Sequence, residues 1–373
     1  MDKDLQTASE SDIFFMRRAM RLAEKAKGMT SPNPLVGAVL VKNGRIIAED
    51  FHKKAGELHA EALVLTEAQE RAKNATLYVT LEPCCHTDKR TPPCTCAIIN
   101  AGIKKVFVAM KDPNPKVFGK GIQELRNHGI AVVEGVLEGR ARKLNEVYYK
   151  YIKTKRPFVI LKTAMTLDGK IATPEGQSKW ITGDRARAIV HRMRCSVDAV
   201  MTAVGTVKAD NPELTARIKC SRQPLRIIID PDLETPLDYK VCKTPPCTIF
   251  VTRHRQQENQ KKAELHEMGI QFIEYEGRKV DLSWLMEHLG KMGITSVLIE
   301  AGSSFNASAL TAGVVDKVIF FIAPKIMCGR DSIQVVGGES FFKLEDALNM
   351  SDVTVRKVGE DIMVEGYITH STA

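Results

Sequence analysis

The sequence predicts an α/β protein built of two domains, and three observations lead to this. Its 373 residues exceed the roughly 250 to 300 at which one hydrophobic core usually stops growing. Apolar segments of strand length alternate with helical patterns, which predicts sheets with parallel pairing. A polar stretch ending in proline, residues 154–157, interrupts the alternation. We therefore expect one domain at residues 1–153 and a second at residues 154–373.

In the first domain, a helix capped by Ser11 and closed by Gly28 comes first. A hairpin follows, and its Asn43-Gly44 turn is of the favoured two-residue type. Beyond it, strands and helices alternate, so an α/β sandwich is expected. The expected strands are residues 76–81, 105–110 and 130–135, and the expected helices are residues 61–72, 94–100, 122–127 and 138–153.

The second domain continues the alternation with no internal repeat. A buried strand from residue 157 turns at Asp168-Gly169, and a helix is expected over residues 185–194. The other expected strands are residues 199–202, 225–230, 248–252, 271–274, 296–300 and 316–322. The last two apolar segments, about 353–358 and 362–369, look like an antiparallel pair, so a mixed sheet is expected.

Composition indicates a soluble globular protein, with 44% hydrophobic and 27% charged residues. No segment has the roughly 18 apolar residues of a membrane span, and the polar, acidic N-terminus does not resemble a secretory signal. We expect a cytoplasmic protein whose nine cysteines are reduced. The net charge of +9 permits nucleic-acid binding, but the basic residues are spread along the chain and suit phosphorylated small molecules equally well.

One stretch carries a recognisable chemistry: His59-Ala-Glu61, then Pro83-Cys84 and Pro93-Cys94. One histidine and two cysteines give zinc three ligands and leave the fourth position open, which is typical of catalytic sites. There the metal lowers the pKa of water, and Glu61 can move protons without ligating. This pattern is the signature of zinc-dependent nucleobase deaminases. A structural zinc site or unliganded buried cysteines are the alternatives, and the prolines beside both cysteines disfavour the second.

The local pattern also suggests why these ligands could meet. His59 lies at the start of one predicted helix, and Pro92-Pro93 favours the start of another at Cys94. The positive ends of two helix dipoles would then converge on the metal and favour thiolate over thiol.

Three other positions are candidate binding residues. The proline-rich loop at residues 31–34 would present the amide of Asn33 to a base edge, unless it is a plain loop. His52 lies just before the zinc motif, and a surface histidine is an equal alternative. In residues 297–306 an apolar strand runs into Gly302 and a helix, which fits a phosphate cradle or an ordinary strand-to-helix turn. It is neither a P-loop nor a dinucleotide fingerprint.

Further motifs occur in both halves. In the first half they are residues 31–39, 59–61, 81–84, 91–94, 111–115 and 119–121, and in the second half residues 161–162, 167–172, 176–182, 298–302 and 323–325. In content and order they resemble the RibD family of bifunctional riboflavin-biosynthesis proteins, over nearly the whole chain. The resemblance implies a cytidine-deaminase-like three-layer sandwich, then a dihydrofolate-reductase-like α/β domain with a mixed sheet.

The resemblance implies two consecutive reactions. The first domain would use one zinc ion to deaminate 2,5-diamino-6-ribosylamino-4(3H)-pyrimidinone 5′-phosphate by hydrolysis. The second would use NADPH to reduce the ribosyl group of 5-amino-6-(5-phosphoribosylamino)uracil to a ribityl chain. The expected partner is thus a small phosphorylated pyrimidine, with no nucleic acid and no membrane, and the resemblance suggests a homodimer or larger homo-oligomer.

Roles for individual residues also follow from the resemblance. His59, Cys84 and Cys94 would hold zinc, and Glu61 would be the general acid–base. The residues contacting the deaminase substrate would be Asn33, His52, His86 and Arg90. The NADPH site would be lined by Lys162, Ala164, Trp180, Thr206, Asp210, Gly302, Ser303, Ser304, Phe305 and Asn306. The reductase substrate would be held by Ser178, Arg194, Leu214, Arg217 and Glu300. Without the resemblance, Trp180 reads as core and Arg194 as a solvated charge.

The chain departs from the family pattern between the zinc cysteines. The segment from Cys84 to Cys94 is one residue longer than usual, and Cys85 stands where the family has serine. Cys85 and Cys96 are therefore alternative thiols, although Cys84 and Cys94 keep the preceding proline. Two other functions stay open: an RNA-editing deaminase and a non-catalytic zinc scaffold. The second half lacks the basic, aromatic-studded stripe typical of single-strand binding.

Overall fold

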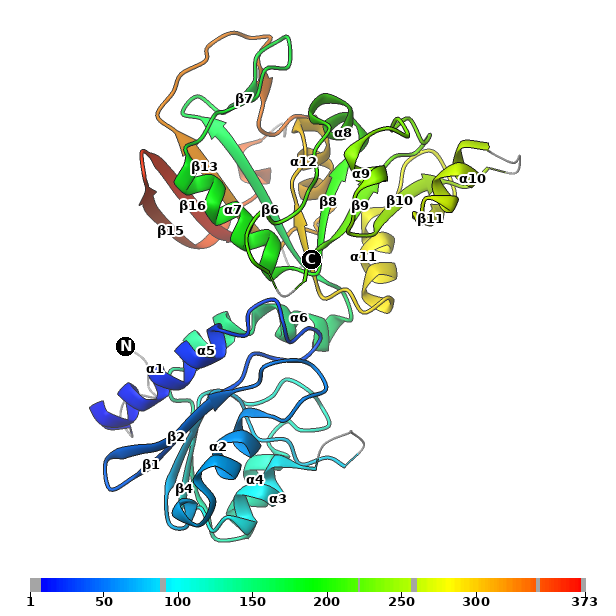
Figure 1. The fold of residues 1–373 in the computed structure, drawn as a ribbon. Coiled ribbons are helices and arrows are strands. Elements are labelled where there is room, and N and C mark those ends of the chain that lie inside the picture. The colour runs from blue at the N-terminus through cyan, green and yellow to red at the C-terminus, as the bar shows by residue number, and fades with distance from the viewer. Residues whose placement is uncertain (1–7, 88–91, 221, 256–259, 340–342, 370–373) are drawn as a thin grey trace. The chain divides into compact units, whose positions relative to one another are not determined.

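The computed structural model describes residues 8–87, 92–220, 222–255, 260–339 and 343–369. The chain divides between Lys155 and Arg156 into two compact units, each with its own hydrophobic core (Figure 1). The division expected from the sequence lay between residues 153 and 154. Among the described residues, no helix combines the length and apolar character needed to cross a membrane.

The first unit is built on a five-stranded sheet with strand order β2-β1-β3-β4-β5. Its strands are β1 (Gly37–Lys42), β2 (Arg45–Phe51), β3 (Thr76–Val79), β4 (Lys105–Val108) and β5 (Ala131–Glu134). Strand β1 pairs antiparallel with β2 and β3, whereas β3, β4 and β5 are parallel. The parallel strands therefore end at the same edge of the sheet, where β3 leads toward the zinc cysteines.

Helices cover both faces of this sheet and complete three layers, with α1 and α5 on one face and α2, α3 and α4 on the other (Figure 1). The helices are α1 (Glu10–Glu24), α2 (Ala60–Ala68), the 3₁₀ turn η2 (Gln69–Ala72), α3 (Cys94–Asn100), α4 (Lys120–Asn127), α5 (Glu138–Leu144) and α6 (Glu146–Thr154). Helix α1 packs directly on β1, because a Cβ at Gly37 would lie 2.0 Å from the carbonyl oxygen of Ala19.

Two predictions for this unit were wrong in detail. Helix α1 is capped by Ser9, not Ser11. Ser9 Oγ accepts the Asp12 N–H at 3.2 Å, and Asp12 Oδ2 accepts the Ser9 N–H at 2.9 Å. This reciprocal capping box defines the helix start. The single helix expected over residues 138–153 is two, α5 and α6, broken at Asn145. The buried Asn145 side chain instead pairs with both backbone polar groups of Leu35, at 2.8 and 3.0 Å.

The second unit is built on a nine-stranded mixed sheet with strand order β11-β10-β9-β8-β12-β6-β13-β16-β15. Its strands are β6 (Phe158–Thr166), β8 (Ala199–Ala203), β9 (Leu225–Ile229), β10 (Thr248–Arg253), β11 (Gln271–Tyr275), β12 (Ser296–Ile299), β13 (Lys317–Ala323), β15 (Met350–Val358) and β16 (Asp361–Ile368). The seven strands from β11 to β13 are parallel. Strand β16 pairs antiparallel with β13, and β15 pairs antiparallel with β16. A small ribbon pairs β7 (Lys170–Ala172) with β14 (Ile333–Gln334).

Helices cover both faces of the parallel part of this sheet, which explains why its parallel strands are nearly continuous apolar segments, whereas most residues of the edge strand β15 are exposed. One face packs on α11 (Leu282–Lys291) and α12 (Ser303–Thr311). The other packs on α7 (Asp184–Ser196), α8 (Val204–Asp210), α9 (Lys240–Lys243) and α10 (Gln260–Glu267). A 3₁₀ turn, η3 (Leu344–Asp346), follows near the C-terminus. In such sheets, ligands bind beyond the carboxyl ends of the strands.

The expectation that all nine cysteines are reduced was wrong. Cys195, at the end of α7, is bonded to Cys220 in the connection between α8 and β9. The two Cα atoms lie 5.7 Å apart although 25 residues separate them in the sequence. The pairing arises because this connection folds back onto α7, a long-range contact that cysteine spacing does not reveal.

Candidate active sites

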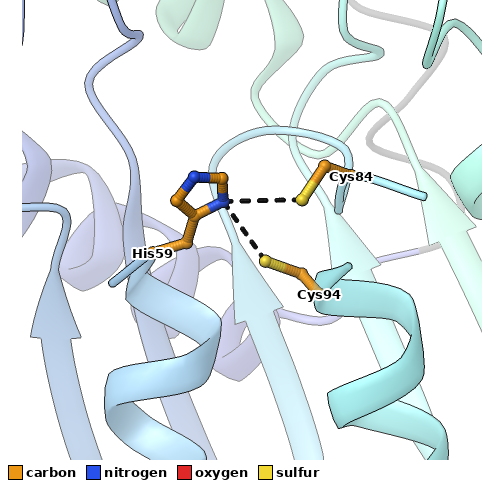
Figure 2. Close-up of side chains that lie close together, drawn as sticks. All are labelled: His59, Cys84 and Cys94. Atoms are coloured by element: carbon orange, nitrogen blue, oxygen red, sulfur yellow. Dashed lines mark hydrogen bonds between the residues drawn. The ribbon is translucent and has the colours of Figure 1, made fainter. Parts of the chain in front are cut away.

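The first unit brings His59, Cys84 and Cys94 together, with one ligand atom of each within 4.8 Å of the others. His59 Nδ1 lies 3.5 Å from Cys84 Sγ and 3.3 Å from Cys94 Sγ (Figure 2). Tetrahedral zinc, with bonds of about 2.0 Å to nitrogen and 2.3 Å to sulfur, places such ligands roughly 3.5 Å apart. The three side chains therefore fit zinc in both donor chemistry and spacing.

Two helix starts position these ligands, as the sequence predicted. His59 is the N-cap of α2, in extended backbone conformation, and Cys94 is the first residue of α3. Cys84 lies beyond the end of β3, and its carbonyl oxygen accepts the N–H of Thr95 in α3 at 3.3 Å. Backbone N–H groups at helix starts stabilise negative charge, so this environment favours the thiolate forms that bind metal.

Glu61 is buried beside the triad, with 3% of its surface exposed. Its Oε2 has no hydrogen-bond partner among the described residues, a rare condition for a buried carboxylate. Burial raises the pKa of Glu61 above its usual range, although the nearby His59 opposes the shift. A carboxyl group that has a raised pKa and an oxygen without a hydrogen-bond partner suits proton transfer at neutral pH.

Asn33 and His52 form a fixed polar pair next to the triad. His52 Nδ1 lies 3.1 Å from the Leu58 carbonyl oxygen and so donates, which leaves Nε2 to accept from Asn33 Nδ2 at 3.1 Å. His52 is buried, so the alternative of a surface histidine is wrong, and burial lowers its pKa and keeps it neutral. Its ring lies 5.3 Å from that of His59. The pair fixes which way the Asn33 amide faces.

Of the other two expected deaminase contacts, the structure describes His86 but not Arg90. His86 is half-buried, two residues after Cys84. Arg90 lies outside the described residues. Cys85 is half-buried and Cys96 is exposed, and neither belongs to the ligand cluster found among the described residues.

Glu82 is a structural residue of this site that the sequence motif contained but did not explain. Its buried carboxylate accepts the backbone N–H groups of Asp112, Gly119 and Ile122 at 3.1, 3.0 and 3.2 Å. These bonds tie the Pro83-Cys84 arm to the loop after β4 and to α4. Helix α4 also packs closely against this arm, because a Cβ at Gly121 would lie 2.1 Å from the Pro83 carbonyl oxygen.

Asp112 extends this network to Tyr148 and Asn114. Its Oδ1 accepts the hydroxyl of Tyr148 at 3.0 Å and the N–H of Asn114 at 2.8 Å. Burial raises the pKa of Asp112 to about 6. Sequence reasoning missed Asp112 and Tyr148, because a separation of 36 residues hides their contact.

In the second unit, Glu300 is held between two cations at the carboxyl end of β12. Arg194 binds it through Nε–Oε1 at 2.6 Å and Nη2–Oε2 at 3.1 Å, and Lys162 Nζ lies 3.3 Å from Oε2. Burial alone would raise the pKa of Glu300, but the charges of Arg194 and Lys162 outweigh it and hold the pKa at about 2. Arg194 is therefore a half-buried binding partner of Glu300, with 13% of its side chain exposed, and the alternative of a solvated charge is wrong.

Other predicted residues of the second unit lie on β6, on α8 and in the loop after β7: Ala164, Thr206 and Asp210 were expected at the cofactor, and Ser178 at the substrate. Ser178 Oγ donates to Asp210 Oδ1 at 3.4 Å, which links the loop after β7 to the end of α8. Thr206 on α8 faces Gly302, since a Cβ at Gly302 would lie 3.6 Å from Thr206 Oγ1. Ala164 lies two residues after Lys162 on β6, so both side chains point to the same face.

Gly302 is the N-cap of α12, and Ser303, Ser304 and Phe305 form its first turn. Asn306 is fully buried and donates from Nδ2 to the Val335 carbonyl oxygen at 2.9 Å. Its Oδ1 has no partner among the described residues. Helix α12 is nine residues long, and the backbone N–H groups of its first turn suit a phosphate group.

Trp180 is not a core residue, because 60% of it is exposed. The guanidinium of Arg187 lies 4.5 Å from its ring centroid. Leu214 is buried and Arg217 is exposed, both in the connection between α8 and β9. Sequence reasoning missed two residues that bind the backbone here: His191 on α7, at Arg217, and Gln223, later in the same connection, at Ala216.

Comparisons with known proteins match both units. A family described as the RibD C-terminal domain matches residues 157–364, and one described as the cytidine and deoxycytidylate deaminase zinc-binding region matches residues 9–110. The riboflavin biosynthesis protein RibD of Actinobacillus pleuropneumoniae is 45% identical over 95% of this chain and 95% of that protein. RibD of Aquifex aeolicus is 46% identical over 95% of this chain and 98% of that protein.

Solved structures of similar proteins superpose on nearly the whole chain. Acinetobacter baumannii RibD (form 1) superposes with a TM-score of 0.86 at 38% identity, over 97% of this chain and 99% of that one. A Thermotoga maritima protein superposes with a TM-score of 0.85 at 38% identity, over 96% and 99%. It is described as a diaminohydroxyphosphoribosylaminopyrimidine deaminase/5-amino-6-(5-phosphoribosylamino)uracil reductase.

The geometry of the triad predicts about one zinc ion per chain. We expect His59→Ala, Cys84→Ala and Cys94→Ala each to lose stoichiometric zinc, because two remaining ligands bind too weakly. Cys85→Ala is the matched control and should keep its zinc, as should Cys96→Ala. Metal content by plasma mass spectrometry after dialysis measures this. Loss of zinc from Cys85→Ala with retention in Cys84→Ala would show that the wrong thiol has been assigned.

The cluster around Glu300 predicts a pH-dependent contribution to stability. The folded pKa of about 2 lies below the ordinary 4.5, so the contribution is present above pH 4.5 and is lost as the pH falls through about 2. At pH 7, Glu300→Gln should lower the free energy of unfolding of the second unit by roughly 3 to 5 kcal/mol, because two buried cations lose their carboxylate.

Urea unfolding at pH 7 and pH 3 measures this difference, which should shrink at pH 3. Glu287→Gln is the control, because Glu287 pairs with Arg156 at the surface and its loss should cost at most about 1 kcal/mol. Equal effects of the two substitutions at pH 7 would contradict the role given to Glu300.

Proposed function

The chain belongs to the RibD family of riboflavin-biosynthesis proteins, and we propose that its two units carry out consecutive steps on one substrate skeleton. It is a bifunctional enzyme with a deaminase unit and a reductase unit. The deaminase unit hydrolyses the amino group from 2,5-diamino-6-ribosylamino-4(3H)-pyrimidinone 5′-phosphate. The reductase unit then converts the ribosyl group of 5-amino-6-(5-phosphoribosylamino)uracil to ribityl with NADPH.

The deaminase assignment depends on one observation. Glu61 is buried beside a triad that fits zinc, and its Oε2 has no hydrogen-bond partner among the described residues. Zinc held by His59, Cys84 and Cys94 supplies a Lewis acid that lowers the pKa of water. Glu61 takes a proton from the attacking water and passes it to the leaving nitrogen, so that the C–N bond breaks and ammonia departs. A purely structural zinc site gives no reason for a buried carboxylate with one unpartnered oxygen at this position.

The Asn33–His52 pair supports recognition of the pyrimidine. Because Asn33 Nδ2 donates to His52 Nε2, the amide oxygen of Asn33 is oriented to accept from an amino or N–H group of the base. His52 in turn is fixed by its bond to the Leu58 carbonyl, so the pair is rigid before substrate arrives. Preformed donors and acceptors of this kind reduce the ordering cost of binding.

In the reductase unit, bound NADPH would supply the hydride for reduction of the ribosyl group. The start of α12, from Gly302 to Asn306, offers N–H groups to cofactor phosphates, and Thr206 on α8 lies beside Gly302. Asp210, at the end of α8, contacts Ser178. Glu300 stays ionised between Lys162 and Arg194, so it presents a fixed acceptor to hydroxyl or N–H groups of the substrate. Arg217 adds an exposed cation suited to the phosphate.

We also propose that the enzyme is cytoplasmic and takes a small phosphorylated pyrimidine in preference to nucleic acid or membranes. A charged substrate and NADPH are both retained inside cells, which supports this location. Homo-oligomers, dimeric or larger, are proposed from the family membership. Light scattering measures the mass in solution, and a value near 41.4 kDa for a single chain would contradict the oligomer.

Glu61→Gln tests the deaminase assignment. We expect zinc to be retained while ammonia release falls roughly 10²- to 10⁴-fold, because proton transfer is lost and the metal ligands are not. NADPH oxidation on the deaminated compound should be unchanged, since it depends on the other unit.

Glu57→Gln, at an exposed position four residues earlier, is the matched control and should behave as the unsubstituted protein. Undiminished ammonia release by Glu61→Gln would favour a zinc scaffold over a zinc catalyst at this triad. Deamination of RNA with no activity on the pyrimidine would favour an editing enzyme.

A further inference from the structure

Residues 213–217, which we call the substrate loop, lie in the connection between α8 and β9 and belong to neither a helix nor a strand. The loop carries Leu214 and Arg217, both proposed to contact the reductase substrate. Fixing such a segment in one conformation costs backbone entropy. Something must therefore hold the loop if it is to present these side chains in one conformation.

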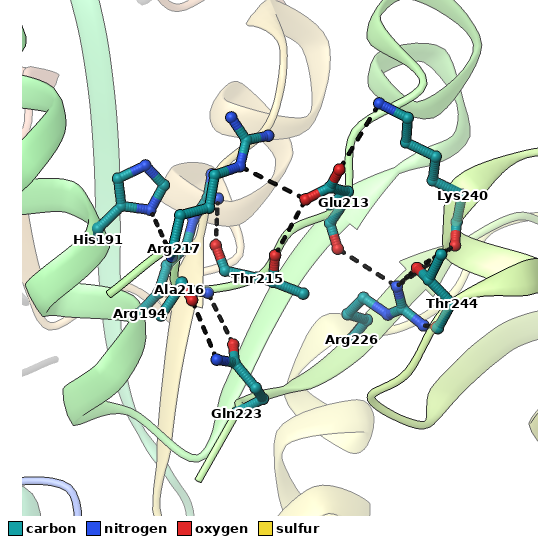
Figure 3. A network of polar contacts seen from close by, with 10 residues as sticks. All are labelled: His191, Arg194, Glu213, Thr215, Ala216, Arg217, Gln223, Arg226, Lys240 and Thr244. Carbon is teal, nitrogen blue, oxygen red and sulfur yellow. Dashed lines mark hydrogen bonds and ion pairs between the residues drawn. The ribbon is translucent and has the colours of Figure 1, made fainter. Parts of the chain in front are cut away.

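Side chains from outside the loop bind its backbone at four positions (Figure 3). Arg194 Nη1 donates to the Thr215 carbonyl at 2.9 Å, and Arg226 Nη1 donates to the Glu213 carbonyl at 3.3 Å. His191 Nδ1 accepts the N–H of Arg217 at 3.2 Å. His191 can accept because burial and the nearby charges of Arg194 and Arg217 lower its pKa and favour the neutral ring.

The fourth contact, from Gln223 to Ala216, is the most complete. Gln223 Oε1 accepts the Ala216 N–H at 2.8 Å, and Gln223 Nε2 donates to the Ala216 carbonyl at 3.0 Å. A single side chain thus satisfies both backbone polar groups of a buried residue, as a neighbouring strand would. Ala216 lies between Thr215 and Arg217, so this contact sets the path of the loop at its centre.

The conformation that the loop adopts is not one the chain favours by itself. Leu214 has a φ of +54°, in the left-handed region that residues other than glycine rarely occupy. Its side chain is nevertheless buried, with 3% exposed. External contacts must offset the cost of this backbone conformation, and the paired bonds of Gln223 begin two residues away.

We propose that Gln223 is a positioning residue of the reductase site, which holds the substrate loop in its binding conformation without touching substrate. The inference rests on the proposed function, because Leu214 and Arg217 are substrate residues only under it. Gln223 suits a test better than the other three side chains. Arg194 also binds Glu300, His191 lies beside both arginines, and Arg226 also binds backbone carbonyls outside the loop.

Gln223→Ala should raise the KM for the deaminated substrate about tenfold, because two hydrogen bonds to the loop are lost, and should leave kcat within about twofold. The KM for NADPH and the rate of ammonia release should not change. Gln223→Glu keeps the acceptor for the Ala216 N–H and loses the donor, so its KM should fall between those of Gln223→Ala and the unsubstituted protein. Gln271→Ala, at an exposed glutamine on the edge strand β11, is the matched control.

A second readout uses ribose 5-phosphate as the probe, titrated calorimetrically into the full chain without NADPH. Its Kd should rise by the same factor in Gln223→Ala. An unchanged Kd and KM, or a fall in kcat alone, would overturn the inference, as would equal losses of both activities, which indicate general destabilisation. If the unsubstituted protein oxidises no NADPH, the proposed function fails, and the ribose 5-phosphate titration still decides the role of Gln223.

Discussion

Parallel strands end together at one edge of a sheet, and both proposed sites depend on that constraint. In the first unit, β3 and β4 end side by side, and the chain beyond them carries Cys84 and Asp112. In the second unit, Glu300 follows β12, and α8 begins directly after β8. Helices that start at these edges add N–H groups that favour anions. In both units the same geometry therefore gathers the residues proposed to bind metal, substrate and phosphate at one edge of the sheet.

The buried Glu61 and Glu82 and the half-buried Glu300 show how the surroundings of one side-chain type decide what it does. Glu82 is satisfied by backbone N–H groups and holds the metal-binding arm in place. Glu300 is satisfied by Arg194 and Lys162, which keep it ionised. Glu61 alone among these has an oxygen with no partner in the described chain. Glu82, whose bonds are all made within the protein, holds the fold of the site, whereas Glu61 keeps one oxygen available for the proton transfer proposed for it.

Local sequence pattern was sufficient for some features and not for others. The strands, the mixed sheet and the zinc triad follow from periodicity, from proline beside cysteine and from the short His-x-Glu spacing, because neighbouring residues determine them. The break between α5 and α6 at Asn145 depends on Leu35, 110 residues away. The Cys195–Cys220 bond and the Gln223 contact depend equally on how the α8–β9 connection folds back. Contacts of this kind arise from tertiary packing, which one sequence does not display.

The claim that one chain performs two consecutive reactions is tested most directly by following both in one sample. Zinc-replete protein is given the diaminopyrimidine ribosyl phosphate, first without and then with NADPH, while ammonia and NADPH are measured together. Ammonia should appear without NADPH, and NADPH oxidation should start only after ammonia has formed and should not exceed it. Oxidation that precedes ammonia release, or proceeds without it, would contradict the proposed order of the two units.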